Sequence, residues 1–114
     1  MTRGHPSGRT DVGRFKTHVR GWALKLRVAP TQVRVQRMTR KWASCSAAGR
    51  VTFSKGLLAQ PRRFQDYVVV HELLHLRVPN HGRLFKSYMS TYVPDWRSIA
   101  RGPLSLGYTG TEVR

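Results

Sequence analysis

Apolar side chains recur along this chain with spacings that change from helical to strand-like and back. The first ones stand three or four positions apart, namely Val12, Phe15, Val19, Trp22 and Leu26. This spacing predicts an amphipathic helix that begins at Asp11 and ends before Pro30. Residues 32–38, 42–46 and 50–54 are short segments with β-branched or alternating apolar residues, and a small turn at 47–49 separates the last two. These segments predict three strands.

Residues 62–77 are the most apolar part of the chain. Apolar residues cover most of the helical circumference here, namely Phe64, Tyr67, Val68, Val69, Val70, Leu73, Leu74 and Leu76. A helix that is apolar on nearly all sides belongs in the middle of a fold. Pro79 and Asn80 end this helix, and a last helix is predicted over residues 82–92. The order of elements predicts an α+β domain with a three-stranded antiparallel sheet.

The length of 114 residues is that of a single domain, which we expect to span residues 11–101. Residues 1–10 are predicted to be a flexible basic arm and residues 102–114 a flexible C-terminal tail. Cys45 is the only cysteine, so an internal disulfide is excluded. The sequence has no apolar run that resembles a signal peptide or a membrane span, and we therefore expect a cytoplasmic protein without membrane contact.

The charge of the chain is strongly positive and unevenly distributed. The formal net charge is +16, and residues 1–65 hold 15 of the 21 basic residues but one of the five acids. Such a surface is typical of proteins that contact DNA or another nucleic acid. The candidate phosphate contacts are Arg34, Arg37, Arg40, Lys41, Arg62 and Arg63. No recognised nucleic-acid-binding motif accompanies them, and a solvated surface or the recognition of acidic peptides would explain the same charge.

The candidate chemistry is concentrated in the apolar helix, in the run His71-Glu72-Leu73-Leu74-His75. Residues four apart share a helical face, so both imidazoles point at one ion. Glu72 lies about 100° around the helix from His71, close to such an ion without binding it. This arrangement is the HExxH motif, which supplies two zinc ligands and a general base. Burying these polar groups without a metal or a partner would be costly.

Catalytic zinc usually takes three protein ligands and keeps one position for water. His81 lies six residues after His75, beyond a break at Pro79 that lets the chain turn back, which gives an HExxH-x5-H arrangement. The same spacing occurs in the HExxHxxGxxH pattern. His81 is therefore the favoured third ligand, and the alternatives are the two downstream carboxylates, Asp95 and Glu112.

The order of these motifs resembles that of a known family. The resemblance is carried by residues 42–46 (Trp-Ala-Ser-Cys-Ser), residues 66–76 around the HExxH motif, Asn80-His81 and Phe85. Together they resemble the YgjP-like metallopeptidase domain, a family similar to the SprT- and WLM-type zincins and to the minigluzincins. The resemblance implies a zincin-like peptidase fold with His71, His75 and His81 around one catalytic Zn²⁺ and with Glu72 as the catalytic residue.

The mechanism expected from these residues is hydrolysis of a peptide bond by metal-activated water, with Glu72 as general base. A second donor to the oxyanion is expected, and the candidates are Tyr88, Tyr92 and His18. Trp42 is a candidate substrate contact if its strand pairs with an extended peptide, and core packing is the alternative for it. The functional hypothesis is a zinc metallopeptidase acting on peptides or proteins. Its rivals are a basic nucleic-acid-binding module with a structural or inactive metal site, and a zinc-free scaffold.

Overall fold

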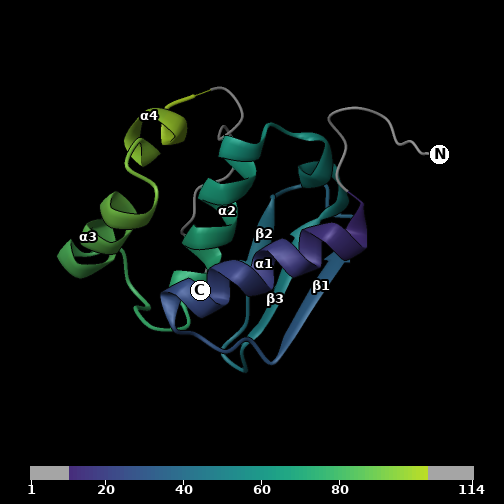
Figure 1. The fold of residues 1–114 in the computed structure, drawn as a ribbon, viewed down its shortest axis with the longest axis horizontal. Coiled ribbons are helices and arrows are strands. Elements are labelled where there is room, and N and C mark those ends of the chain that lie inside the picture. The colour runs from purple at the N-terminus through teal and green to yellow at the C-terminus, as the bar shows by residue number, and fades with distance from the viewer. Residues whose placement is uncertain (1–10, 103–114) are drawn as a thin grey trace.

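The computed structural model describes residues 11–102, so the predicted arm at 1–10 and the predicted tail from 103 onward lie outside the described residues. The elements are α1 (Val12–Leu26), β1 (Gln32–Gln36), β2 (Ala43–Cys45), β3 (Arg50–Ser54), the 3₁₀ helix η1 (Lys55–Ala59), α2 (Arg62–Leu74), α3 (Arg83–Tyr92) and α4 (Trp96–Ala100). Helices α1 and α2 cover one face of the sheet, and α3 and α4 lie beside α2 farther from the sheet (Figure 1). The predicted α+β class is confirmed.

The sheet is mixed, so the predicted antiparallel arrangement is wrong for one of its two strand pairs. The strand order is β1-β3-β2, in which β2 runs antiparallel and β1 parallel to β3. Strand β3 takes the central place because residues 51–54 are buried on both of its faces, as in strands that are covered from both sides. Since β1 and β2 flank β3, the connection at 37–42 has to cross the end of β3. We call residues 37–42 the crossing loop.

Helix α2 is the central element, as its composition predicted. Ten of its 13 residues are buried. Helix α1 packs beside it through one apolar stripe, in which the ring of Phe15 meets the ring of Phe53 from β3 edge to face at 5.2 Å. The short helix α4 was not predicted, although Trp96 and Ile99 pack against the core from it. Within residues 11–102, no helix is both long enough and apolar enough to cross a membrane.

Candidate metal centre and active site

The end of α2 places the two histidines of the HExxH motif on one face. The helix ends at Leu74, three residues earlier than predicted, and His75 is its C-cap residue. Beyond it the hydrogen bonds shorten to the 3₁₀ pattern, as the Leu76 N–H donates to the Leu73 carbonyl at 3.0 Å. Because His75 keeps helical backbone angles (φ −66°, ψ −12°), its ring stays beside that of His71, with centroids 4.9 Å apart.

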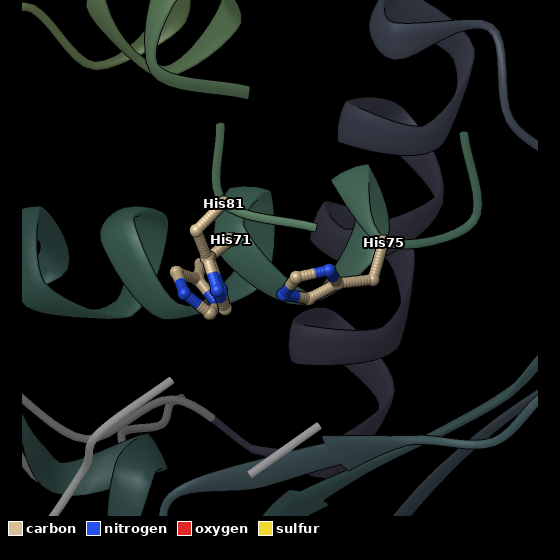
Figure 2. A group of neighbouring side chains, drawn as sticks. All are labelled: His71, His75 and His81. Carbon is tan, nitrogen blue, oxygen red and sulfur yellow. The ribbon is translucent and has the colours of Figure 1, made fainter. Parts of the chain in front are cut away.

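The chain then turns back and brings His81 to the same place. In this turn the Asn80 side-chain oxygen accepts a hydrogen bond from the Gly82 N–H at 3.1 Å, which fixes the backbone on both sides of His81. The ring of His81 lies 5.1 Å from that of His71 and 4.7 Å from that of His75. One ligand nitrogen from each histidine lies within 4.8 Å of the other two (Figure 2). Small ring rotations therefore suffice for all three to reach one ion.

The surroundings of His75 fit a metal ligand. Both of its ring nitrogens are buried, and among the described residues their one polar contact is with the backbone of Val78, which leaves a buried nitrogen without a partner, a costly state for a polar group out of water. Burial, assisted by the neighbouring His71, lowers the pKa of His75 to about 4. The ring is therefore neutral near pH 7, the form in which imidazole binds metal. A set of imidazole nitrogens suits zinc, so the residues present fit the ion that the motif implies.

Phe85 of α3 forms the wall behind the three imidazoles. Its ring centroid lies 5.2 Å from His71, 4.9 Å from His75 and 4.8 Å from His81, and its side chain is buried. A large apolar ring in contact with all three imidazoles limits their rotation and keeps water away from that side. The sequence motif included Phe85, but no role followed from its spacing.

Glu72 lies beside the histidines in a buried environment. Its side chain is 1% exposed, and its Oε2 atom lies 3.4 Å from Nδ1 of His71. Burial and the charge of Glu72 together raise the pKa of the Cys45 thiol to about 11 and that of the Tyr67 hydroxyl to about 12. Both groups are therefore protonated near pH 7, and a protonated thiol is neither a nucleophile nor a good metal ligand.

Cys45 belongs to β2, which packs against α2, and Tyr67 lies on α2 itself, so the charge of Glu72 reaches both groups. Sequence reasoning missed Tyr67 as part of this environment. The available signal was its position four residues before His71, on the same helical face. Its ring centroid lies 6.0 Å from that of His71.

His18, a predicted oxyanion donor, takes part in a network centred on Asp66. The Asp66 Oδ1 atom lies 2.6 Å from His18 Nε2 and accepts a hydrogen bond from Trp22 Nε1 at 3.0 Å. The Arg62 guanidinium, which can only donate, bonds His18 Nδ1 at 3.2 Å, so His18 donates to Asp66 through Nε2. Burial opposes the ionisation of Asp66, but the hydrogen bonds from His18 and Trp22 and the positive charge of Arg62 outweigh it and lower the pKa.

The other predicted donors and the alternative ligand Asp95 also have contacts of their own. The Tyr92 hydroxyl donates to the Lys25 carbonyl at 3.5 Å and so joins α3 to α1. Tyr88 stacks on Tyr92, and the Arg77 guanidinium lies over its ring. Asp95 forms an ion pair with Arg63 and is not a member of the histidine group. Glu112 lies outside the described residues.

The predicted phosphate contacts fall into two groups by what surrounds them. Arg34 donates to Gln36, Arg62 bonds His18, and Arg63 pairs with Asp95. The other three candidates line a cavity of about 580 Å³ at the crossing loop, together with further residues, namely Arg37, Met38, Thr39, Arg40, Lys41, Trp42, Ser54, Lys55 and Gly56. The half-buried Trp42 ring packs edge to face against Phe64, at 5.4 Å. DNA binding stays a prediction from charge.

The fold is similar to those of two solved metallopeptidase zymogens. One is jannalysin of Methanocaldococcus jannaschii, with a TM-score of 0.70 and 21% identity over 86% of this chain and 95% of that chain. The other is abylysin of Pyrococcus abyssi, with a TM-score of 0.66 and 20% identity over 75% of this chain and 87% of that chain. At these identities the likeness concerns the fold.

The sequence itself identifies the family. No curated protein matches the chain. The profile of the YgjP-like metallopeptidase domain matches residues 12–102, which includes every helix and strand described above. The three histidines and the buried glutamate lie inside the matched region. The chain therefore belongs to the YgjP-like metallopeptidase domain family.

Proposed function

We propose that this protein is a zinc metallopeptidase of HExxH-x5-H type, in which His71, His75 and His81 hold the metal and Glu72 acts as general base. The observation that carries the proposal is the convergence of three imidazoles beside a buried carboxylate. Membership of a metallopeptidase family supports the same activity. Structural zinc sites are usually closed by four protein ligands, so three histidines favour a catalytic centre over a structural one.

A zinc ion bound at this site supplies a Lewis acid that polarises a carbonyl group and lowers the pKa of water to about 7. Glu72 takes the proton of the attacking water and passes it to the leaving amine. Its position beside His71, in apolar surroundings, holds the carboxylate close to the histidines for both transfers. Phe85 shields the opposite side of the imidazoles, and the protonated Cys45 and Tyr67 do not compete with Glu72 for the proton.

Strand β2 is the edge that we propose for substrate pairing. The Ser54 N–H donates to the Trp42 carbonyl, and the Ser46 N–H donates to the Arg50 carbonyl, so these backbone groups face β3. Because backbone groups alternate along an antiparallel strand, Ala43 and Cys45 direct theirs to the open edge. An extended peptide that adds to this edge has its backbone hydrogen-bonded beside Cys45, which is within reach of the Glu72 charge.

Two of the three predicted candidates for the second oxyanion donor already donate to acceptors within the protein. His18 donates to Asp66, and the Tyr92 hydroxyl donates to the Lys25 carbonyl. We therefore propose that Tyr88, on the same helix as Phe85, is the first of the three to test. A donor of this kind contributes through hydrogen bonds that strengthen in the transition state.

The test of the function is Glu72→Gln, which keeps the shape of the side chain and removes the base. We expect zinc content, measured by elemental analysis, to stay at the wild-type level and peptide hydrolysis to fall by about 10²–10⁴-fold. Asp66→Asn is the matched control, because it makes the same chemical change on the same helix, and it should keep most of the activity. Wild-type hydrolysis by Glu72→Gln would contradict the proposed role of Glu72.

A further inference from the structure

We propose that the cavity beside β2 is a specificity pocket that binds acidic side chains of the peptide substrate. We call it the basic cavity and define it by the cations that line it, namely Arg37, Arg40, Lys41 and Lys55. Trp42 and Gly56 complete its walls, and its volume is about 580 Å³. The inference rests on the proposed peptidase function, to which it adds a preference among substrates.

The topology of the sheet builds this cavity. One wall is the crossing loop, and the other is the segment in which β3 passes into η1. Ser54, which is 4% exposed, ties the two walls together. Its N–H donates to the Trp42 carbonyl at 2.8 Å, its hydroxyl donates to the Met38 carbonyl at 3.3 Å, and the same hydroxyl accepts from the Gly56 N–H at 3.2 Å. These partly buried hydrogen bonds therefore fix the two walls of the cavity relative to each other.

The four cations of the basic cavity have no counterion within residues 11–102. Among the described residues none of them forms an ion pair, and no acidic residue lines the cavity. By contrast, Arg62 and Arg63 have Asp66 and Asp95 as partners. Positive charges gathered in a concave surface repel one another and raise the local concentration of anions. A carboxylate that enters the cavity relieves this repulsion and accepts charge-assisted hydrogen bonds.

The position of the cavity relates it to the active site. Trp42 belongs to the cavity wall and directly precedes β2, and β2 packs against α2, the helix that carries Glu72, with Cys45 at the far end of β2 within reach of the Glu72 charge. The three steps from Trp42 to Cys45 span about 10 Å at about 3.3 Å per residue. A peptide extended along β2 thus brings a side chain about three or four residues from the cleaved bond to the cavity. This is the substrate position at which we expect Asp or Glu to be preferred.

The details of the cavity favour a peptide carboxylate over a nucleic acid. Binding of single-stranded nucleic acid without sequence preference relies on aromatic rings on which bases stack. The aromatic ring in this cavity, Trp42, is half-buried and packs edge to face against Phe64. A phosphate track would also need cations beyond the cavity, and Arg62 and Arg63 are already paired with acids. The local cluster of charge matches a compact acidic side chain.

The experiment compares two peptides that differ by Glu or Gln at a position three or four residues from the cleaved bond. Arg40→Ala with Lys41→Ala removes two charges from the basic cavity. The control variant, Lys86→Ala with Arg97→Ala, also loses two positive charges. These charges line a different cavity, of about 400 Å³, on α3 and α4. We expect wild type and control to prefer the Glu peptide by about tenfold in kcat/KM at low salt, as a few partly exposed charge pairs allow. The basic-cavity variant should lose this preference and cleave the Gln peptide normally.

Binding of the same peptides to Glu72→Gln, measured by fluorescence polarisation, separates the two proposals. A Glu preference that depends on Arg40 and Lys41 supports the specificity pocket, even if the wild-type protein cleaves neither peptide and the peptidase function fails. Equal binding of both peptides, or equal loss of preference in the control, overturns the pocket. The pocket is also overturned if the basic-cavity variant loses binding of a single-stranded oligonucleotide but keeps the Glu preference.

Discussion

Helix α2 carries two clusters that each combine histidine with a carboxylate, and the two differ in how their polar atoms are satisfied. In the first, Asp66 accepts hydrogen bonds from His18 and Trp22, and Arg62 bonds the other nitrogen of His18. In the second, His75 lies beside His71 with both of its ring nitrogens buried, and among the described residues the one polar contact of these nitrogens is with the Val78 backbone. In the first cluster, the carboxylate and both ring nitrogens of His18 have partners within the protein. In the second, potential metal-ligand nitrogens of the histidines face one another.

This difference agrees with a structural role for the first cluster and with the proposed metal-binding role for the second. Hydrogen bonds from α1 to Asp66 hold two helices together, and the network leaves no atom of the His18 ring available to a ligand. In the second cluster, one nitrogen of each of three imidazoles converges on the same place, which is the arrangement that a bound metal ion requires. Residue type alone does not distinguish the two clusters, since each contains an acid and histidine on or against the same helix.

The largest effect is expected from removing one imidazole of each cluster. His75→Ala should lower zinc affinity by more than about 100-fold, because losing a ligand costs more than losing the partner of a ligand. His18→Ala, which deletes the same side chain from the Asp66 network, should keep zinc. Elemental analysis after dialysis against a weak chelator measures both variants. Retention of zinc by His75→Ala, or its loss from His18→Ala, would break the distinction between the clusters.

A smaller effect is expected from Asp66→Asn, which weakens the network between α1 and α2. The lowered pKa of Asp66 means that its ionised form stabilises the fold above the unfolded-state pKa, and that this contribution is lost as the pH falls through the folded-state pKa. At pH 7 we expect the free energy of unfolding to fall by about 1–2 kcal/mol. Below about pH 4 the gap between variant and wild type should close. Urea denaturation at about pH 7 and below about pH 4 measures this difference in the free energy of unfolding. A difference that does not change with pH would contradict a stabilising role for the ionised Asp66 carboxylate.

The smallest effect is expected from Tyr92→Phe. The hydrogen bond from the Tyr92 hydroxyl to the Lys25 carbonyl is long at 3.5 Å, and the ring contact with Trp22 survives the substitution. Stability should change by about 0.5 kcal/mol or less, and kcat/KM should stay within about twofold of wild type. Tyr88→Phe is the informative comparison in the same assay. A large loss of turnover in Tyr92→Phe would return Tyr92 to the list of oxyanion donors.

Local patterns predicted most of the helices and strands and the meeting of the three histidines. The spacing of His71, His75 and His81 depends on one helix and the turn after it, so a short stretch of sequence contains the whole arrangement. The parallel pairing of β1 with β3 involves residues 18 apart, such as Val33 and Val51, and local alternation does not encode it. One signal was available, because Val51 and Phe53 with Thr52 between them form the most apolar strand and hence the best candidate for the centre of the sheet.

The role of His18 could not be predicted for a similar reason. Its partner Asp66 lies 48 residues away, and only the packing of α1 on α2 brings the two together. A histidine in a predicted helix is equally consistent with a hydrogen-bond donor to the oxyanion and with a surface residue. The network was therefore visible only when the tertiary structure placed Trp22 and Arg62 around the same carboxylate.

The crossing loop has a consequence for how substrate preference can diverge in proteins of this kind. Its residues 37–41 form a wall of the basic cavity, and hydrogen bonds from Ser54 anchor the loop at the end of β3. The histidines come from α2 and the turn that follows it, a different part of the chain. Side chains of the loop can therefore change from basic to acidic or apolar without moving a metal ligand. One scaffold can in this way keep its chemistry constant while its substrates change.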